Sequence, residues 1–458
     1  MNITRSIETL FRKYLPSPFT IAVLLTLLTI VIAFLFTDAR NDENHLVSIL
    51  KYWESGIWNS ALLVFAYQMM LILVLGHILV LSKPMSRLID RLVGFVKNGG
   101  NAVILVSIST MLVSFFNWGL GLIFGAIMAR KVGEYAKENN IEINYPLVGA
   151  SGYVGLMVWH GGISGSAPLK VAESGHLTQL MQQLISPEFS SSLPEYIGTG
   201  ETIFSLSNLL IFGVLLFCVP FVLYRINSTV KPTAIHLEKY RSIFRKEDKV
   251  SGSDRLDRSG LLAVSFGILL LLASFFQYRG MLSDLIITPN FLNIFMLGMA
   301  IVLHGNFTRF LHALEEAIKG ASGILIQFPL YFGIMGIMSG SGMVGELSSF
   351  FVSVSNEVTL PIFTFFSAGL VNIFVPSGGG QWAVQGPIVI ESAMKLGVPL
   401  PKAVMALAYG DQVTNMLQPF WALPLLGITK LKAKEILPYT LLIMIVGMFV
   451  YITGLLLF

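Results

Sequence analysis

The sequence predicts an all-α polytopic membrane protein, built as an inverted repeat of broken helices with two re-entrant helical hairpins. Three observations predict this fold. Of the 458 residues, 54% are hydrophobic and 12% are charged, which is about half the charged fraction of a soluble protein. Apolar runs of about 20 residues recur from end to end. Two further apolar stretches are longer and are interrupted near their centres by residues that disfavour helix.

Nine apolar runs have roughly the length of one membrane-spanning helix. They cover residues 18–37, 57–82, 145–170, 203–225, 260–276, 288–304, 320–340, 400–428 and 437–457. No small-residue cleavage site precedes the first run, so we expect a retained first helix and not a signal peptide. The lone Cys218 excludes a disulfide framework and a cysteine-based metal site.

The distribution of Lys and Arg predicts the orientation in the membrane. Basic residues lie before and after residues 102–133, so this stretch should enter and return from the cytoplasm as a hairpin. Residues 173–201 carry no Lys or Arg and should lie outside, whereas residues 225–258 are rich in both and should be cytoplasmic. Residues 360–396 then form a second hairpin that enters from the outside. The chain should make about nine crossings, with a cytoplasmic N-terminus.

The opposite entry of the two hairpins predicts two inverted halves. The string LVSFFNWGLG (112–121) aligns with LVNIFVPSGG (370–379), and both have a helix breaker at the tip. The predicted organisation is a first repeat (1–225, with hairpin 102–133 and broken helix 145–170), a basic cytoplasmic loop and linking helix (226–287), and a second repeat (288–458, with hairpin 360–396 and broken helix 400–428).

The string VPSGGGQW (375–382) places helix breakers inside apolar sequence. Unpaired backbone groups are costly in hydrocarbon and are tolerated where they line a cavity. A helix that begins at the glycines presents free N–H groups and a partial positive charge, which together make an anion site. The alternative is an interfacial turn or tight helix packing. We expect two such tips and two broken helices to form one small polar pocket.

The candidate binding residues lie at these tips and breaks. They are Ser377, Gly378, Gly379, Gly380, Gln381 and Trp382 at the second tip, Asn117, Gly119 and Gly121 at the first tip, and Ser164, Ser166 and Gln418 at the breaks. Their hydroxyl and amide groups can contact a carboxylate or a cation. Two of them have alternatives, because Trp382 could be an ordinary packing aromatic and Asn117 only a helix cap.

Asp411 is a carboxylate in otherwise neutral apolar sequence, and such residues by default mark ion or proton pathways. It could carry a proton, or form part of a Na⁺ site with Asn415, Thr414 and nearby carbonyl groups. The alternative is an ion pair or a position near the membrane surface. His160, beside the first break, could titrate near neutral pH or be a structural core histidine.

Several strings resemble the AtoE-type short-chain fatty acid transporter family, which is placed near the ion-transporter superfamily of dicarboxylate and citrate carriers. They are VPSGGGQWAVQGP (375–387), AYGDQVTNMLQPFWALPLLGI (408–428), FNWGLGLIFGAIMAR (116–130), GGISGSAPL (161–169), GILIQFPLYFGI (323–334) and LPSPFTIAVLLTLLT (15–29). The likeness runs almost from end to end. Three positions depart from the family pattern: His160 stands where glycine is more usual, Gln381 where histidine is, and Asp411 where glutamate is.

The resemblance implies a multi-pass carrier of the bacterial inner membrane for short-chain fatty acids such as acetoacetate or butyrate. It also implies an elevator-type fold with a dimerising scaffold, and hence a homodimer. No Arg or Lys lies in either tip or break, which favours a monocarboxylate over a dicarboxylate. We expect H⁺ or Na⁺ as the driving ion, no other cofactor, and no nucleic-acid partner. The sequence carries no catalytic motif of an enzyme. The alternatives are a dicarboxylate or other organic-anion carrier and an uncoupled anion channel.

Overall fold

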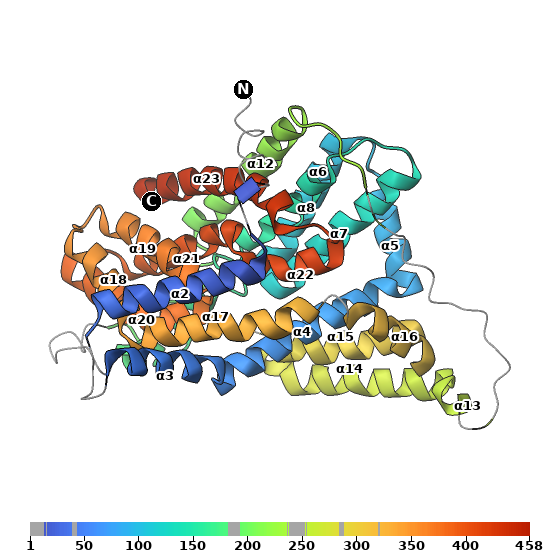
Figure 1. The fold of residues 1–458 in the computed structure, drawn as a ribbon, viewed down its shortest axis with the longest axis horizontal. Helices are drawn as coiled ribbons and strands as arrows, with labels where there is room; N and C mark the ends of the chain where they lie inside the picture. Colours follow the sequence, from blue (N-terminus) through green and yellow to red (C-terminus); the bar gives the residue numbers. More distant parts are fainter. Residues whose placement is uncertain are drawn as a thin grey trace.

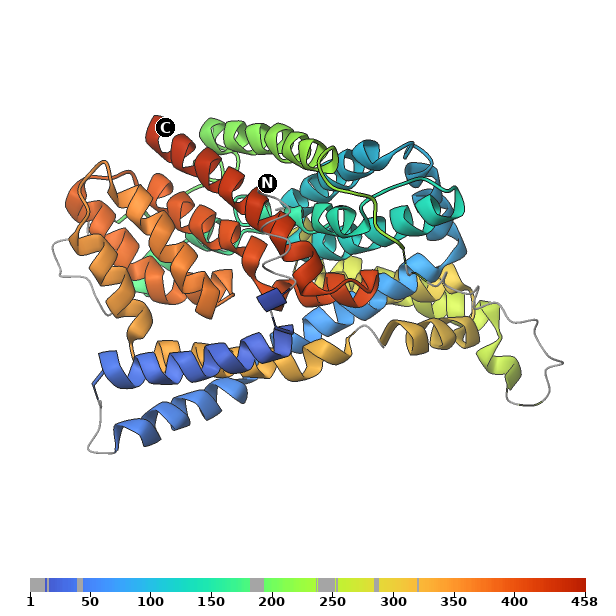
Figure 2. The same ribbon diagram turned by 45° about the horizontal axis from the view of Figure 1, so that its top comes forward.

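The computed structural model describes residues 13–14, 16–38, 44–181, 193–235, 237, 252, 254–283, 288–318 and 321–458. Within these residues every regular element is a helix (Figure 1). The helices form two layers, which stay separate when the molecule is turned (Figure 2). We call them the lower and the upper layer, as they lie in Figure 1. About half of the predicted cytoplasmic loop, 226–258, lies outside the described residues, namely 236, 238–251 and 253.

In the described part of the chain, six helices are long and apolar enough to cross a membrane, or seven if one bent pair counts as a single span. The six are α2 (Pro18–Phe36), α4 (Ser60–Leu81), α6 (Gly99–Phe116), α12 (Leu206–Asn227), α14 (Gly260–Ser283) and α23 (Ala433–Leu457). These helices indicate a multi-pass membrane protein. They are fewer than the nine predicted runs because several of those runs are short or broken helices; α15 (Pro289–His304), for example, has 16 residues.

The lower layer contains α2, α4, α14 and α15 together with three further helices (Figure 1). These are α3 (His45–Ile57), α16 (Phe307–Ala317) and α17 (Ser322–Gly340). α17 packs along α2 and α3, and α15 packs along α4 and α14. Glycine makes the approach of α3 and α17 possible, because a Cβ on Gly336 would lie 2.2 Å from the Tyr52 carbonyl oxygen. The sequence did not predict α3, whose apolar residues are not continuous.

The first hairpin consists of α6 and α7 (Trp118–Glu138), joined by the single residue Asn117. Asn117 has an extended backbone, with φ −152° and ψ 122°, and its side-chain oxygen accepts the Leu120 amide at 2.9 Å. The side chain therefore caps α7 at the point where α6 ends. The hairpin covers 99–138, close to the predicted 102–133.

The second hairpin consists of α19 (Leu360–Phe374) and α20 (Gly378–Leu396). Pro376 lacks an N–H and disfavours helix in the residue before it, so α19 ends there. Ser377 then caps α20, because its hydroxyl accepts the Gly380 amide at 3.3 Å. α18 (Met343–Ser353) follows α17 and packs against both helices of this hairpin.

Two broken helices complete the upper layer with α12 and α23. In the first, α8 (Tyr145–Ser151), a 3-10 turn (Val154–Met157) and an irregular stretch precede α9 (Ser166–Ala172). In the second, α21 (Leu400–Thr414), a 3-10 turn (Asn415–Leu417) and Gln418 precede α22 (Pro419–Thr429). The two 3-10 turns contact each other. The short helices α5 (Lys83–Val93), α10 (His176–Met181) and α13 (Asp254–Asp257) lie outside these groups.

The packing between the two halves of the chain is reciprocal. α2 packs on α17 and α4 on α15; α7 packs on α22 and α20 on α9; α12 packs on α23. Each hairpin thus packs against the broken helix of the other half as well as against that of its own half. The contacts between halves, which we call crossed packing, bring both tips and both breaks into one region.

Candidate functional site

The first hairpin tip lies against residues 158–166, the irregular stretch of the first broken helix. The Trp118 amide donates to Ser164 Oγ at 2.9 Å. The Ile163 amide donates to the Phe115 carbonyl oxygen at 2.7 Å. These bonds satisfy backbone groups that a helix end and a broken helix would otherwise leave unpaired.

The second tip lies against the same irregular stretch. A Cβ on Gly378 would lie 2.8 Å from His160 Cε1, so only glycine fits this close approach. A Cβ on Gly379 would have Ser166 Oγ as its nearest neighbour, at 3.9 Å, and Gly379 is exposed. The structure therefore brings the two tips to one segment, with open space beside Gly379.

The start of α20 has the backbone geometry of an anion site. The Gln381 amide donates to the Ser377 carbonyl oxygen at 2.7 Å, which is the first hydrogen bond of the helix. The amides of Gly378 and Gly379 come before this bond and have no intrahelical acceptor. Ser377, Gly379 and Gly380 are all at least partly exposed. N–H groups at such a helix start favour a carboxylate.

The other first-tip candidates lie deeper. Asn117 is 2% exposed and acts as the cap described above. A Cβ on Gly121 would lie 1.9 Å from Ser114 Oγ, so Gly121 allows α6 and α7 to pack closely. A Cβ on Gly119 would lie 3.5 Å from Asn117 Oδ1, an ordinary contact.

Aromatic rings surround the two tips. The rings of Trp118 and Trp159 lie 5.8 Å apart between centroids, and those of Trp118 and Trp421 lie 5.1 Å apart. Phe420 continues the group at 4.9 Å from Trp421. The group joins the first tip to both broken helices and offers apolar surface beside the backbone site. The sequence did not assign these rings to the site, because aromatic residues are common in every apolar run.

The lower layer contributes to the site through α17. The Tyr331 ring lies 5.0 Å from that of Phe420, and a Cβ on Gly380 would lie 3.4 Å from Met335 Cε. The Tyr331 hydroxyl and the Trp159 indole N–H are buried and have no hydrogen-bond partner among the described residues. A buried polar group without a partner is rare and requires an explanation, and a ligand in the site could provide it.

Asp411 and His160 form a buried pair between the two breaks. His160 is 0% and Asp411 1% exposed, and His160 Nδ1 lies 2.5 Å from Asp411 Oδ2. The Ala167 amide, at the start of α9, donates to His160 Nε2 at 3.0 Å. Because a nitrogen that accepts carries no proton, the ring proton lies on Nδ1 and is donated to Asp411.

Gln412 fixes the position of this pair. Its Oε1 accepts the amides of His160 at 2.7 Å and of Gly161 at 3.1 Å. Its Nε2 donates to the Tyr451 hydroxyl at 2.8 Å, which in turn donates to the Met157 carbonyl oxygen. The first break is therefore hydrogen-bonded to α21 and α23 through one glutamine that the sequence did not single out.

Three oxygens of the second break surround an amino group of the second hairpin. Asn372 Nδ2 donates to the Asp411 carbonyl oxygen at 2.8 Å, to Thr414 Oγ1 at 2.9 Å and to Asn415 Oδ1 at 2.8 Å. Gln418 Nε2 donates to the Asn372 carbonyl oxygen at 2.6 Å and so helps to cap α19. The structure thus groups the predicted Thr414 and Asn415, but around Asn372 and not around the Asp411 carboxylate.

Gln381 and Trp382 point away from the opening at Gly379. Gln381 Nε2 donates to the Ala368 carbonyl oxygen at 2.8 Å and to Gln385 Oε1 at 2.7 Å, inside the hairpin. The Trp382 indole donates to His176 Nε2 at 3.0 Å, and its side chain is 1% exposed. The structure therefore leaves these two candidates apart from the backbone site.

Two solved transporter structures resemble this chain at 15% sequence identity. One is the YdaH transporter of Alcanivorax borkumensis, with a TM-score of 0.46 over 96% of this chain and 97% of that one. The other is MtrF of Neisseria gonorrhoeae, from a class of antimetabolite efflux pumps, with a TM-score of 0.43 over 98% of this chain and 97% of that one. Likenesses of this size support no conclusion about the site.

Sequence relatives are much closer. A protein of Escherichia coli (strain K12) is 36% identical over 465 residues, which cover 100% of this chain and 99% of the relative. A protein of Haemophilus influenzae is 35% identical over 464 residues, which cover 99% and 98%. Both carry the provisional name of short-chain fatty acid transporter. The profile of the short chain fatty acid transporter family matches residues 1–458. This chain therefore belongs to the short-chain fatty acid transporter family, a family of transporters and not of enzymes.

Proposed function

We propose that this chain is a secondary active transporter that moves a short-chain monocarboxylate, such as acetoacetate or butyrate, across the bacterial inner membrane. The observation that carries the proposal is the meeting of both hairpin tips on residues 158–166, beside a buried carboxylate. The backbone N–H groups of Gly378 and Gly379 bind the substrate carboxylate. The acyl chain lies against the aromatic group that contains Trp118 and Trp159.

The charge of the site supports a monocarboxylate. No Arg or Lys occurs in the tip strings or in the breaks at 158–166 and 411–418. Backbone dipoles supply only partial charges, which suit one carboxylate. A dianion would require a full cation to offset the cost of its desolvation.

Proton coupling rests on the pair of His160 and Asp411. An added proton has two positions: the Asp411 carboxylate or His160 Nε2. Protonation of Nε2 breaks its bond to the Ala167 amide, which begins α9 next to Ser166. Protonation of the His160–Asp411 pair therefore changes the hydrogen bonding of the segment that contacts the second tip. This change links proton binding to the substrate site.

Sodium coupling is the second candidate, and a specific observation favours it. The three oxygens around Asn372 Nδ2 have the chemistry of ligands for a hard cation. Asn372 Oδ1 is buried and has no hydrogen-bond partner among the described residues. Rotation of the amide by half a turn would remove the amino group and add Oδ1 as a fourth oxygen, so that Na⁺ could occupy the centre.

The proposal includes an inverted repeat, an elevator movement and a homodimer. The reciprocal packing of the two halves supports the repeat, and the separation into two layers supports a scaffold below a moving transport layer. The N-terminus lies in the cytoplasm, as the distribution of Lys and Arg predicts. In this arrangement the substrate crosses between α17 and the two tips.

Uptake by purified protein in proteoliposomes tests the function. Labelled butyrate, acetoacetate and succinate are offered under an imposed H⁺ gradient, an imposed Na⁺ gradient, or neither. We expect butyrate and acetoacetate to accumulate under one of the two gradients and succinate to be excluded. Succinate transport without butyrate transport would indicate a dicarboxylate carrier. Butyrate flux without accumulation or counterflow would indicate a channel.

A further inference from the structure

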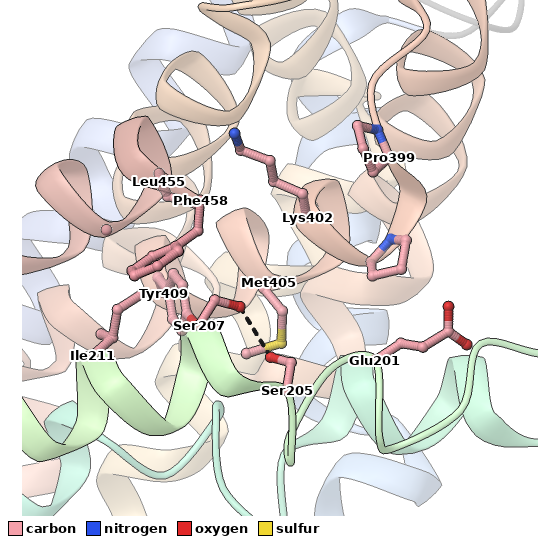
Figure 3. Close-up of a pocket in the computed structure, with 12 residues that line it drawn as sticks. Glu201, Ser205, Ser207, Ile211, Pro399, Lys402, Met405, Tyr409, Leu455 and Phe458 are labelled. Carbon is pink, nitrogen blue, oxygen red and sulfur yellow. Dashed lines mark hydrogen bonds between the residues drawn. The ribbon is translucent and has the colours of Figure 1, made fainter.

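A cavity of about 190 Å³ opens at the ends of α12, α21 and α23 (Figure 3). We call it the vestibule. It is separate from the hairpin tips, and none of the residues discussed for substrate or ion binding lines it. Its lining includes Ser205, Ser207, Ile211, Lys402, Leu455 and Phe458.

The lining has an apolar side and a polar side. Phe458, Leu455 and Ile211 lie together on the left of Figure 3, with Met405 near its centre. Ser205 and Ser207 lie 3.1 Å apart between their hydroxyl oxygens, within hydrogen-bond distance of each other. Such a division into apolar wall and few polar groups is typical of a small-molecule site.

Lys402 is a cation in the lining of the vestibule. No ion pair joins Lys402 to any described residue. The opposite charge, Glu201, lies on the right of Figure 3, away from the apolar side. Its Oε1 already accepts the Gly198 amide at 3.1 Å. One ammonium group beside apolar wall suits a ligand with one negative charge and a short hydrocarbon tail.

The size of the vestibule limits the ligand. Pockets for drug-sized molecules have volumes of about 300–1,000 Å³, and the vestibule is smaller, at about 190 Å³. A carboxylate with only a few carbon atoms fits this volume.

The floor of the vestibule connects it to the first break. The Tyr409 hydroxyl donates to Asn208 Oδ1 at 2.9 Å, and Asn208 Nδ2 donates to the Gly161 carbonyl oxygen at 2.8 Å. Beyond this bond lies a cavity of about 10 Å³ lined by Asn208, Gly161 and Gln412 among others. The hydrogen bonds from Tyr409 to Asn208 and from Asn208 to Gly161 separate the vestibule from the His160–Asp411 pair. A ligand in the vestibule therefore occupies a site distinct from that pair.

We propose that the vestibule is a second binding site for a small aliphatic monocarboxylate. The carboxylate pairs with Lys402 and accepts the hydroxyl proton of Ser207, and the alkyl chain lies against Ile211, Leu455 and Phe458. The Ser205 hydroxyl already donates to the Thr202 carbonyl oxygen at 2.8 Å. The proposal rests on the proposed function for the choice of ligand, but not for the geometry of the site.

Equilibrium binding of radiolabelled butyrate to the purified full chain in nanodiscs tests this site. At saturation we expect two butyrates per chain for the wild type and one for Lys402→Gln. Lys402→Arg keeps the charge and should restore the second butyrate. The matched control Glu201→Gln removes the other charge of the same vestibule and should retain both.

A variant of the tip separates this proposal from the proposed function. Gly379→Leu fills the open space beside the second tip and should retain one butyrate, the one in the vestibule. If Gly379→Leu still binds two butyrates per chain and Lys402→Gln binds one, the vestibular site is supported and the proposed tip site is wrong. One butyrate per wild-type chain that Lys402→Gln still binds, or two butyrates bound by Lys402→Gln, overturns the vestibular site. Size-exclusion chromatography of each variant verifies that it is folded.

Discussion

Asp411 is the residue on which energy coupling depends in the proposed mechanism. Asp411→Asn removes the charge, while the amide oxygen can still accept the proton of His160 Nδ1. We expect accumulation against a gradient to fall to simple equilibration, whereas butyrate exchange continues. The free energy of unfolding should decrease by about 1 kcal/mol, because a hydrogen bond to a neutral acceptor replaces one to a charged acceptor. Uptake and counterflow in proteoliposomes, with thermal unfolding, measure these effects.

Glu391→Gln is the matched control for this variant. Glu391 pairs with Lys395 on the surface of α20 at 2.6 Å, so its carboxylate has no place in the proposed coupling. This control should accumulate butyrate as the wild type does. Normal accumulation by Asp411→Asn would show that another group carries the driving ion.

Gly379 and Gly378 are adjacent, and the structure predicts different results when each is replaced. A leucine at 379 projects into open space, so Gly379→Leu should fold normally and lose most transport by blocking the substrate carboxylate. An alanine at 378 meets His160 at 2.8 Å, so Gly378→Ala should destabilise the protein by about 1–3 kcal/mol, the usual cost of overpacking. Uptake and thermal unfolding distinguish the two effects. Gly345→Leu, at another open helical position, is the control and should change neither uptake nor thermal unfolding.

The limits of sequence prediction at this scale are visible in the residues that follow the second tip. The string PSGGG shows where a helix begins, and this is enough to locate the free amides of Gly378 and Gly379. It does not show how α20 is rotated about its axis. Gln381 and Trp382 come within one turn of the tip, yet their side chains point to Gln385 and His176. That rotation depends on packing against α19 and α10, which no local pattern encodes.

At the scale of elements, α10 is held to α20 by a bond that acid should break. His176 is partly buried, and burial, followed by the charge of Lys170, lowers its pKa from the usual 6.5. Its Nε2 accepts the Trp382 indole proton, so only the neutral ring makes this bond. A lowered pKa means that the bond stabilises the fold above pH 6.5 and that this contribution is lost as pH falls through the lower value. Hydrogen exchange of residues 176–181, relative to intrinsic rates, should therefore increase in acid.

His176→Phe is the control for this pH effect, since phenylalanine does not titrate. Exchange in the variant should be the same above and below the transition. An equal increase in the wild type and in His176→Phe would mean that acid acts on α10 through another group.

Arg130 joins α7 to the end of α22. Its Nε donates to Glu134 Oε1 at 2.8 Å and its Nη1 to the Ile428 carbonyl oxygen at 2.8 Å, and the side chain is buried. Arg130→Met leaves Glu134 without this partner, so we expect a loss of about 3–5 kcal/mol in the free energy of unfolding. The double variant Arg130→Met/Glu134→Met should lose less, because the buried carboxylate is removed together with the guanidinium. Lys131, whose Nζ lies 3.7 Å from Glu134 Oε2, is 15% exposed and can be solvated by water when that carboxylate is absent. Thermal unfolding in detergent compares them. The exposed pair of Lys170 and Glu173 is the reference, where Lys170→Met should cost at most about 1 kcal/mol.

The sequence located most elements because breakers mark their ends. Asn117 and the string around Pro376 define both hairpins to within a few residues. Continuous hydropathy found the long helices but not α3, which is amphipathic, nor the 3-10 turns inside the broken helices. The orientation of each hairpin in the membrane was inferred from Lys and Arg and remains a prediction.

At the scale of the whole molecule, the site is assembled from distant parts of the chain. His160 and Asp411 are 251 positions apart, and Tyr331 of the lower layer contacts Phe420 of the second broken helix. A pattern along the sequence can mark each residue as unusual, but it cannot pair them, since the pairing follows from the crossed packing of the two halves. The prediction that the two tips meet depended on the inverted-repeat hypothesis, in addition to the helix breakers that mark each tip.

The two layers provide the last prediction, because elevator transport requires one to slide past the other. Phe328 on α17 and Phe420 on α22 face each other across the layers, with ring centroids 4.0 Å apart. In a Cys218→Ser background, we expect oxidised Phe328→Cys/Phe420→Cys to lose uptake and to regain it on reduction. Tyr278→Cys/Phe291→Cys, within the lower layer at 5.7 Å, is the control and should transport after oxidation. Gel mobility after cleavage between the cysteines measures the extent of cross-linking. Undiminished uptake by a fully cross-linked Phe328 and Phe420 pair would exclude sliding at this contact.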